Sequence, residues 1–228
     1  MTRKAIVTGV SRGLGAALVD QLATGGWEVL PVSRSIGECV DLSSAQSLTA
    51  WLGGGALTRF LGDATDILLI NNAGMVEPIG SSGTLEPAAV QNAIQLNVTA
   101  PIVLTDAVLA ARRPGTQVRI VHISSGAGRR PLAGWAVYCA TKAALDMHAQ
   151  ALASERLDGV RVAAIAPGVV DTDMQGVIRD ADFPDRDRFR DLKADGNLTA
   201  PADSAAAILR LVERDDFGDR VIADVRDP

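Results

Sequence analysis

The sequence predicts an α/β fold in which a doubly wound parallel β-sheet carries helices on both faces. Three observations lead to this prediction. Short β-branched or apolar runs alternate with stretches of helical spacing along all 228 residues. One of these runs, 67–70, is wholly apolar, as is typical of a strand buried on both faces. The glycine-rich and polar motifs follow the ends of such runs, where an open parallel sheet binds its ligands.

The composition favours a single domain spanning residues 1–228. With 47% hydrophobic residues, the chain is long enough for one sizeable core and short for two. The net charge of -5 and the absence of a Lys/Arg block argue against a nucleic-acid partner. We expect a cytoplasmic protein, because the apolar run 5–7 is too short for a signal peptide and no later run approaches a membrane span.

The cysteines and histidines do not form a metal-binding pattern. Cys39 and Cys139 are too few for a disulfide framework and have no His or Cys partners at zinc-site spacing. His122 and His148 also lack metal-ligand spacing. We predict packing or structural roles for all four residues and no metal site.

The first predicted strand, 5–8, leads into a glycine turn and then into a helix over 16–22. Gly9, Gly13 and Gly15 would let the backbone approach a pyrophosphate, and the helix N-terminus would supply free amides and a partial positive charge. This arrangement predicts a dinucleotide site in a Rossmann-type sheet. A structural turn without a ligand is the alternative, since the spacing differs from G-x-G-x-x-G.

The second predicted strand, 27–33, is followed by Arg34, where an acidic residue would normally hold a ribose 2′-hydroxyl. A guanidinium there, together with Arg12 in the glycine turn, matches a ribose 2′-phosphate by charge and fork geometry. We therefore predict NADP(H) rather than NAD(H) as the cofactor. A solvated loop charge at Arg34 is the alternative.

Two further strands end in residues suited to the same cofactor. A short strand over 39–42 carries Asp41, which can accept a hydrogen bond from an adenine amine. The apolar strand 67–70 is followed by a motif of small residues that would admit the cofactor, Asn71-Asn72-Ala73-Gly74.

The rest of the chain supplies the remaining layers of the fold. Strands are predicted over 118–123, 160–165 and 220–225, and the helices over 97–111 and 138–152 would pair either within the chain or between subunits. The charged segment 179–195 is a candidate cover over the site, with a merely solvated helix as the alternative.

Tyr138 and Lys142 are four residues apart where the chain becomes helical, so both side chains can point into one cleft. A phenol titrates near pH ~10 when unperturbed, and a nearby cation favours its ionised form. The pair would then act as a general acid/base unit near neutral pH. Alone, a Tyr and a Lys at this spacing are more often a solvated face.

With these motifs together, the chain resembles the short-chain dehydrogenase/reductase family from end to end. Thr8-Gly9-x-x-x-Gly13-x-Gly15 matches the family's cofactor turn, and 71–74 matches its central-strand motif. The resemblance implies a catalytic tetrad of Asn97, Ser125, Tyr138 and Lys142, in which Ser125 is chosen over Ser124 because it stands thirteen positions before the tyrosine. It also implies a cofactor site formed by Gly9, Ser11, Arg12, Gly13, Leu14, Gly15, Arg34, Asp41, Leu42, Asn72, Ala73, Gly74, Tyr138, Lys142, Pro167, Gly168, Val170 and Thr172.

The mechanism implied by this resemblance is hydride transfer from NADPH to a carbonyl carbon while Tyr138 protonates the developing alkoxide. Lys142 would bind the nicotinamide ribose and favour the ionised tyrosine, Ser125 would orient the substrate oxygen, and Asn97 would hold a water in the proton relay. A redox sensor that binds NADP(H) without turnover and a structural subunit with a vestigial site are the rival classes.

Within the family, the chain is similar to the sepiapterin reductase and benzil reductase branch through residues 167–175 and 192–227. This similarity implies that a ketone or α-dicarbonyl is reduced, with other small carbonyl compounds or alcohols as the alternative. It implies that Ser125, Tyr138 and Asp224 contact the substrate, with Asp224 holding a pterin-like ring. An outward-facing residue on an edge strand is the alternative for Asp224. A homodimer or homotetramer without nucleic-acid or membrane partners is also implied.

Overall fold

The computed structural model describes residues 2–227 and contains the predicted parallel sheet. Within this part of the chain, the sheet has seven strands in the order β3-β2-β1-β4-β5-β6-β7, and every neighbouring pair is parallel. The strands are β1 (Arg3–Thr8), β2 (Glu28–Ser33), β3 (Glu38–Cys39), β4 (Asp66–Asn71), β5 (Gln117–Ile123), β6 (Val160–Ala166) and β7 (Ile222–Asp224).

Strand order reverses between β1 and β4, because β1 pairs with β2 on one side and with β4 on the other. In an open parallel sheet, the crevice outside the carboxyl ends of the strands at such a switch point is the usual ligand site. The glycine turn follows β1 and the motif of small residues follows β4, so both predicted cofactor motifs lie at this crevice.

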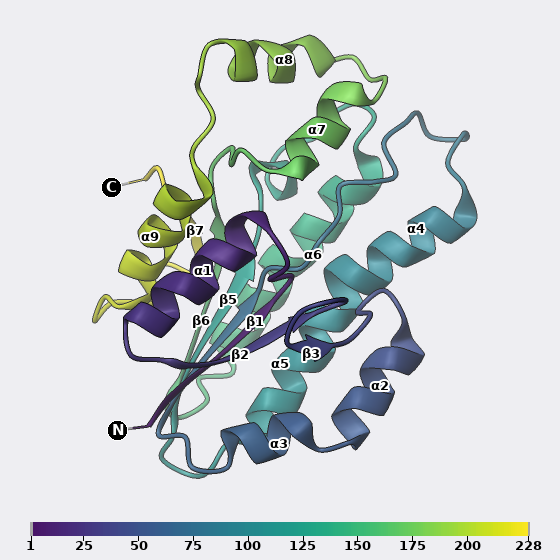
Figure 1. Cartoon of the computed structure of the whole chain (residues 1–228). Coiled ribbons are helices and arrows are strands. Elements are labelled where there is room, and N and C mark those ends of the chain that lie inside the picture. Colours follow the sequence, from purple (N-terminus) through teal and green to yellow (C-terminus); the bar gives the residue numbers. More distant parts are fainter. Residues whose placement is uncertain (1, 228) are drawn as a thin grey trace.

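Helices cover both faces of the sheet, as Figure 1 shows. One core cluster lies between the sheet and the helices α1 (Gly13–Thr24) and α9 (Pro201–Val212). The other lies between the opposite face and α2 (Ala45–Gly53), α3 (Ala56–Leu61), α5 (Ala100–Ala111) and α6 (Ala136–Ser154). All six residues of β4 are buried, because this strand has core on both sides. The predicted doubly wound α/β fold is therefore confirmed.

The helical stretch Pro87–Ala111 consists of α4 (Pro87–Ile94), a π-helical segment η1 (Gln95–Thr99) and α5. Its length and a window of mean hydropathy 1.5 satisfy the criteria for a membrane span, contrary to our expectation that no run would approach one. In the structure, Leu104 and Val108 of this stretch are buried in the core beneath the sheet. The apolar side chains of this stretch therefore pack it against the domain core.

The cover predicted over 179–195 spans the last residues of α7 (Asp173–Asp180), a turn, and α8 (Arg186–Ala194). Figure 1 shows both helices beyond the carboxyl edge of the sheet. Phe183 and Phe189 are buried here, and Phe189 stacks on Trp135 with ring centroids 5.3 Å apart. This segment therefore packs through an aromatic cluster, which a merely solvated helix would not do.

Candidate active site

A cavity of about 920 Å³ lies at the carboxyl edge of the sheet. Every residue predicted to contact the cofactor lines this cavity, and Ser125 lines it as well. Asn97 and Asp224 are not among the lining residues. The cavity has an apolar side formed by residues such as Val76, Leu132, Trp135, Ile178 and Phe189.

The glycine turn is shaped for close approach to a phosphate group. Gly9 and Gly13 have positive φ values of 72° and 57°, which favour glycine. A Cβ atom at Gly15 would lie 2.1 Å from the Gly9 carbonyl oxygen, so a side chain cannot be accommodated there. Arg12, the N-cap residue of α1, makes no capping hydrogen bond with its side chain. The first amides of α1 are therefore available to an anion, as the pyrophosphate of a dinucleotide requires.

Asn72 fixes the two strands of the switch point to each other. Its side-chain nitrogen donates to the carbonyls of Thr8 and Gly9 at 2.8 and 3.1 Å, and the Thr8 hydroxyl accepts from the backbone amides of Asn72 and Ala73. The amide group of Asn72 thus holds the cofactor crevice in shape.

Arg34 and Arg12, the two residues predicted to hold a 2′-phosphate, both line the cavity but have different partners. Arg34 is exposed and has no ion pair within residues 2–227. Arg12 Nη1 forms an ion pair with Asp173 Oδ2 at 2.6 Å, which connects the glycine turn to the start of α7. Arg12 would have to exchange this carboxylate for a phosphate, whereas Arg34 would not.

Asp41 lies at the expected edge of the cavity but is already involved in a local turn. Its Oδ1 accepts hydrogen bonds from the Ser43 amide and hydroxyl at 3.0 and 2.6 Å. This leaves Oδ2 without a partner among these contacts for an adenine amine.

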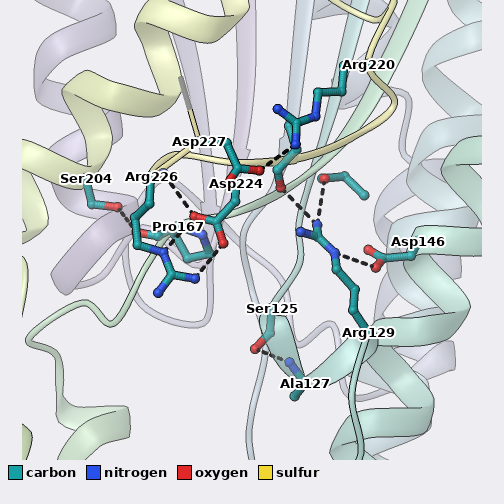
Figure 2. Close-up of polar contacts among 12 residues, drawn as sticks. Ser125, Ala127, Arg129, Asp146, Pro167, Ser204, Arg220, Asp224, Arg226 and Asp227 are labelled. Carbon is teal, nitrogen blue, oxygen red and sulfur yellow. Dashed lines mark hydrogen bonds and ion pairs between the residues drawn. The ribbon is translucent and has the colours of Figure 1, made fainter.

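The two consecutive serines after β5 have different surroundings. Ser124 is buried and its hydroxyl donates to Asp146 Oδ1. Ser125 is half-buried, and its hydroxyl accepts a hydrogen bond from the Ala127 amide at 3.1 Å (Figure 2). A hydrogen bond from Ser125 also lowers the pKa of Tyr138. Ser125 is therefore the serine placed beside the tyrosine, as the thirteen-residue spacing predicted.

Tyr138 is buried on the cavity wall, with its ring edge against Trp135 at a centroid distance of 5.6 Å. Burial raises the pKa of Tyr138 to about 12, and the hydrogen bond from Ser125 opposes this rise. This differs from our expectation of a phenol that Lys142 makes easier to ionise. In this environment the cost of burying a phenolate outweighs any effect of the lysine.

Lys142 is also buried, and burial lowers its pKa to about 8, while the Asp146 carboxylate raises it. Its Nζ atom donates to the Ile123 carbonyl at 2.8 Å and lies 5.6 Å from the centroid of the Tyr138 ring. Lys142 and Tyr138 thus face the same cavity, as their four-residue spacing predicted. The structure adds that the ammonium is anchored by the end of β5.

Asn97 lies in the π-helical segment η1, and its amide group is used within the protein. Asn97 Oδ1 accepts from the Met75 amide at 2.9 Å, and Nδ2 donates to the Met75 carbonyl at 2.7 Å and to the Thr141 hydroxyl at 3.2 Å. Asn97 therefore fixes the chain after Gly74 to α6. Its side chain does not reach the cavity, so the expected contact with a relay water has no support in the side-chain geometry.

Asp146 lies one turn after Lys142 on α6 and is buried. Besides Ser124, it binds Arg129, whose Nε atom lies 3.2 Å from Asp146 Oδ2. Arg129 also donates to the Ala223 carbonyl in β7 at 2.9 Å. Asp146 was not predicted from the sequence, although its i, i+4 position relative to Lys142 was a signal that could have identified it.

Asp224 does not occupy the substrate-facing position that we predicted. It is 8% exposed at the end of β7, and both its carboxylate oxygens bind the Arg226 guanidinium at 2.6 and 2.8 Å. The alternative, an outward-facing residue, is wrong as well, because the side chain is buried. Arg226 lines the cavity instead.

His122, which is buried, and His148, which is half-buried, form a pair outside the cavity. Their Nε2 and Nδ1 atoms are 3.0 Å apart, and Asn71 Nδ2 lies 3.2 Å from His122 Nδ1. Burial lowers the pKa of His122 to about 3, so this ring is neutral. The contacts agree with the structural role predicted for both histidines.

Comparison with known proteins agrees with this geometry. Residues 3–182 match the sequence profile of the short chain dehydrogenase family. A benzil reductase ((S)-benzoin forming) from Bacillus cereus is 34% identical over 94% of this chain and 96% of its own length. A sepiapterin reductase from Meriones unguiculatus is 35% identical over 93% of this chain and 92% of its own length.

A solved structure adds evidence on the cofactor. The 3-ketoacyl-(acyl-carrier-protein) reductase from Brucella melitensis, crystallised with NADH, superposes with a TM-score of 0.80 at 26% identity, over 98% of this chain and 96% of that one. The shared fold and the glycine turn identify the cavity as the site of a nicotinamide cofactor. This chain therefore belongs to the short-chain dehydrogenase/reductase family, in the branch that includes the benzil and sepiapterin reductases.

Proposed function

We propose that this oxidoreductase uses NADPH to reduce a ketone or α-dicarbonyl compound, such as a benzil-like or sepiapterin-like substrate, to an alcohol. The observation that carries this proposal is the side-by-side placement of Ser125, Tyr138 and Lys142 on the wall of the nicotinamide cavity. The names of the two curated relatives support the carbonyl substrate class.

Each side chain has a distinct part in the proposed reaction. The Ser125 hydroxyl, oriented by the Ala127 amide, holds the substrate carbonyl oxygen next to Tyr138. Bound NADPH supplies the hydride that is transferred to the carbonyl carbon. Tyr138 gives its phenolic proton to the oxygen, which completes the alcohol. With its pKa raised to about 12, the phenol is protonated at neutral pH and is ready to act as the acid.

Lys142 has an electrostatic role in this proposal. As an ammonium it binds a ribose hydroxyl and stabilises the phenolate that remains after proton transfer. Asp146 supports this role by raising the pKa of Lys142 against the effect of burial. Asn97 is a positioning residue, because it fixes the Met75 backbone beside this part of the cavity.

The preference for NADPH rests on Arg34. Its guanidinium follows β2 at the edge of the cavity, where a 2′-phosphate would be paired by charge and by bidentate geometry. Arg12 contributes once it exchanges Asp173 for this phosphate.

The test is a cofactor-oxidation assay with benzil, a small α-diketone, sepiapterin and an aromatic aldehyde, each with NADPH and with NADH. Sustained oxidation of NADPH with at least one of these carbonyl compounds is the expected result. Stoichiometric NADPH binding without turnover on the whole panel would contradict the proposal and favour a redox sensor.

A further inference from the structure

Arg226 and Asp224 form a two-pronged ion pair at the end of β7. Arg226 Nε and Nη2 donate to the two carboxylate oxygens of Asp224 at 2.8 and 2.6 Å, and the Arg226 amide donates to Asp224 Oδ1 at 3.0 Å (Figure 2). Arg226 also lowers the pKa of Asp224, so the carboxylate is ionised at neutral pH. Such a fork fixes the plane of the guanidinium.

Arg226 lines the cavity with 56% of its side chain exposed, whereas Asp224 does not line it. The Arg226 side chain passes over Gly168, where a Cβ atom would lie 4.0 Å from Arg226 Cδ. Ser125 and Arg226 follow the ends of β5 and β7, and these strand ends are separated by two strand spacings, about 10 Å, because β6 lies between them. A substrate of two aromatic rings spans this distance.

A guanidinium offers only hydrogen-bond donors. The edge of Arg226 that Asp224 binds is occupied, and the remaining N–H groups have no hydrogen-bond partner among residues 2–227. Arg130 and Arg188 also line the cavity and have no ion pair in this part of the chain. These arginines add hydrogen-bond donors and positive charge to a lining that also carries the carboxylates of Asp171 and Asp173.

We propose that Arg226 is a specificity-determining residue that binds a hydrogen-bond acceptor, a carboxylate or carbonyl oxygen, remote from the carbonyl group that is reduced. Asp224 is the positioning residue that holds the guanidinium in this orientation. The preferred substrates are then carbonyl compounds that carry a second acceptor at their far end. This inference rests on the proposed reductase function and names its substrate class.

The same ion pair disfavours substrates that need a free carboxylate. Sepiapterin has a 2-amino-4-oxopteridine ring, whose neighbouring N–H donors match a carboxylate in the same two-pronged manner as a guanidinium does. In this chain the Asp224 oxygens are already bound by Arg226. A pterin would have to displace a guanidinium from its partner, and the removal of Arg226 should remove this competition.

The experiment measures kcat/KM with NADPH for benzil, 4-carboxybenzil and sepiapterin in the full-length protein. The variants are Arg226→Met, Asp224→Asn/Arg226→Met, and Arg220→Met as the matched control. Arg220 pairs with Asp227 at 2.6 Å in the same terminal segment but does not line the cavity. Arg226→Gln, which keeps a polar side chain, is the second variant if Arg226→Met does not fold.

Wild-type protein should prefer 4-carboxybenzil to benzil. Arg226→Met should lower this ratio by about tenfold or more, as expected for the loss of a charge-assisted contact, without weakening NADPH binding. The kcat/KM of the same variant for sepiapterin should rise relative to that for benzil. In the double variant this rise should be absent. Arg220→Met should keep the wild-type ratios.

Some results would overturn the inference and leave the proposed function intact. In the first, the wild-type protein reduces benzil, but Arg226→Met leaves the substrate ratios unchanged. In the second, Arg220→Met changes the ratios as much as Arg226→Met does. A loss in Arg226→Met that is fully explained by weaker NADPH binding would place Arg226 at the cofactor and would also overturn it. If the wild-type protein reduces none of these three compounds but does reduce the small α-diketone or the aromatic aldehyde, the inference fails and the proposed function stands. If it reduces none of the five, both fail.

Discussion

The Lys142 ammonium lies 5.6 Å from the centroid of the Tyr138 ring and donates a hydrogen bond to the Ile123 carbonyl. Both groups are buried, and burial favours the uncharged form of each. It raises the pKa of Tyr138 to about 12 and lowers the pKa of Lys142 to about 8. The phenol therefore keeps its proton throughout the neutral range. The ammonium is the group whose charge is lost first as the pH rises.

This difference predicts the alkaline limit of the reduction. Lys142 acts as an ammonium, so kcat/KM should fall as the pH rises through about 8. The Asp146 carboxylate raises the pKa of Lys142, and Asp146→Asn removes that charge. The pKa of Lys142 should then drop further, and the fall in kcat/KM should begin at a lower pH than in the wild type. The measurement is a pH–rate profile for both proteins.

Arg129→Met is the matched control for Asp146→Asn, because it removes the cation that pairs with the same carboxylate. Without Arg129, the Asp146 charge acts more strongly on Lys142, so the alkaline fall should move to higher pH. Since Arg129 also binds the Ala223 carbonyl, thermal melting should be recorded alongside the profile. Shifts in the same direction for both variants would contradict the electrostatic role of Asp146.

Arg34→Ala should weaken NADPH binding by about tenfold or more and leave NADH binding nearly unchanged. A charge-assisted hydrogen bond is worth about 1.5–3 kcal/mol, and each 1.4 kcal/mol is a tenfold change in Kd. Titration of each cofactor against intrinsic fluorescence gives both constants. Arg130→Ala, which removes another cavity-lining arginine, serves as the control. Equal losses of NADPH and NADH affinity in Arg34→Ala would show that Arg34 does not recognise the 2′-phosphate.

Asp173→Asn should tighten NADPH binding by up to about fivefold, because it frees Arg12 for the 2′-phosphate and removes a carboxylate from the mouth of the cavity. The size of the effect is limited because both partners are exposed, and exposed pairs contribute about 0.2–1 kcal/mol. Asp171→Asn is the control, since Asp171 pairs with Lys193. Weaker NADPH binding in Asp173→Asn would show that the Arg12–Asp173 pair shapes the site instead.

The sheet could be predicted largely from sequence because its strands are short apolar runs bounded by glycine or polar motifs. The exception is β3, predicted over 39–42 and found at Glu38–Cys39. The Asp41 amide donates to the Ser47 hydroxyl and its carboxylate accepts from Ser43, so local side-chain contacts replace strand pairing. The apolar residues Val40 and Leu42 are still buried, which explains the strand-like pattern.

The candidate site was predictable where a motif is continuous in the sequence and less so where it depends on tertiary contacts. The glycine turn, Ser125, Tyr138 and Lys142 all reach the cavity. Asn97 does not, because its amide group is hydrogen-bonded to the Met75 backbone and to the Thr141 hydroxyl. Asp224 does not either, because its nearest guanidinium, two residues along the chain, takes both carboxylate oxygens. Nothing in the residue pattern distinguished that pairing from a free carboxylate.

The central claim is that Tyr138 is the proton donor of a carbonyl reduction, and Tyr138→Phe tests it most directly. Phenylalanine keeps the buried ring against Trp135 and removes only the hydroxyl, so the fold and NADPH binding should be preserved. General acid catalysis contributes about 10²–10⁴-fold, so kcat/KM for the best carbonyl substrate should fall by at least about a hundredfold, with the Kd for NADPH within a few-fold of wild type. Reduction at a rate close to that of the wild-type protein would contradict this account.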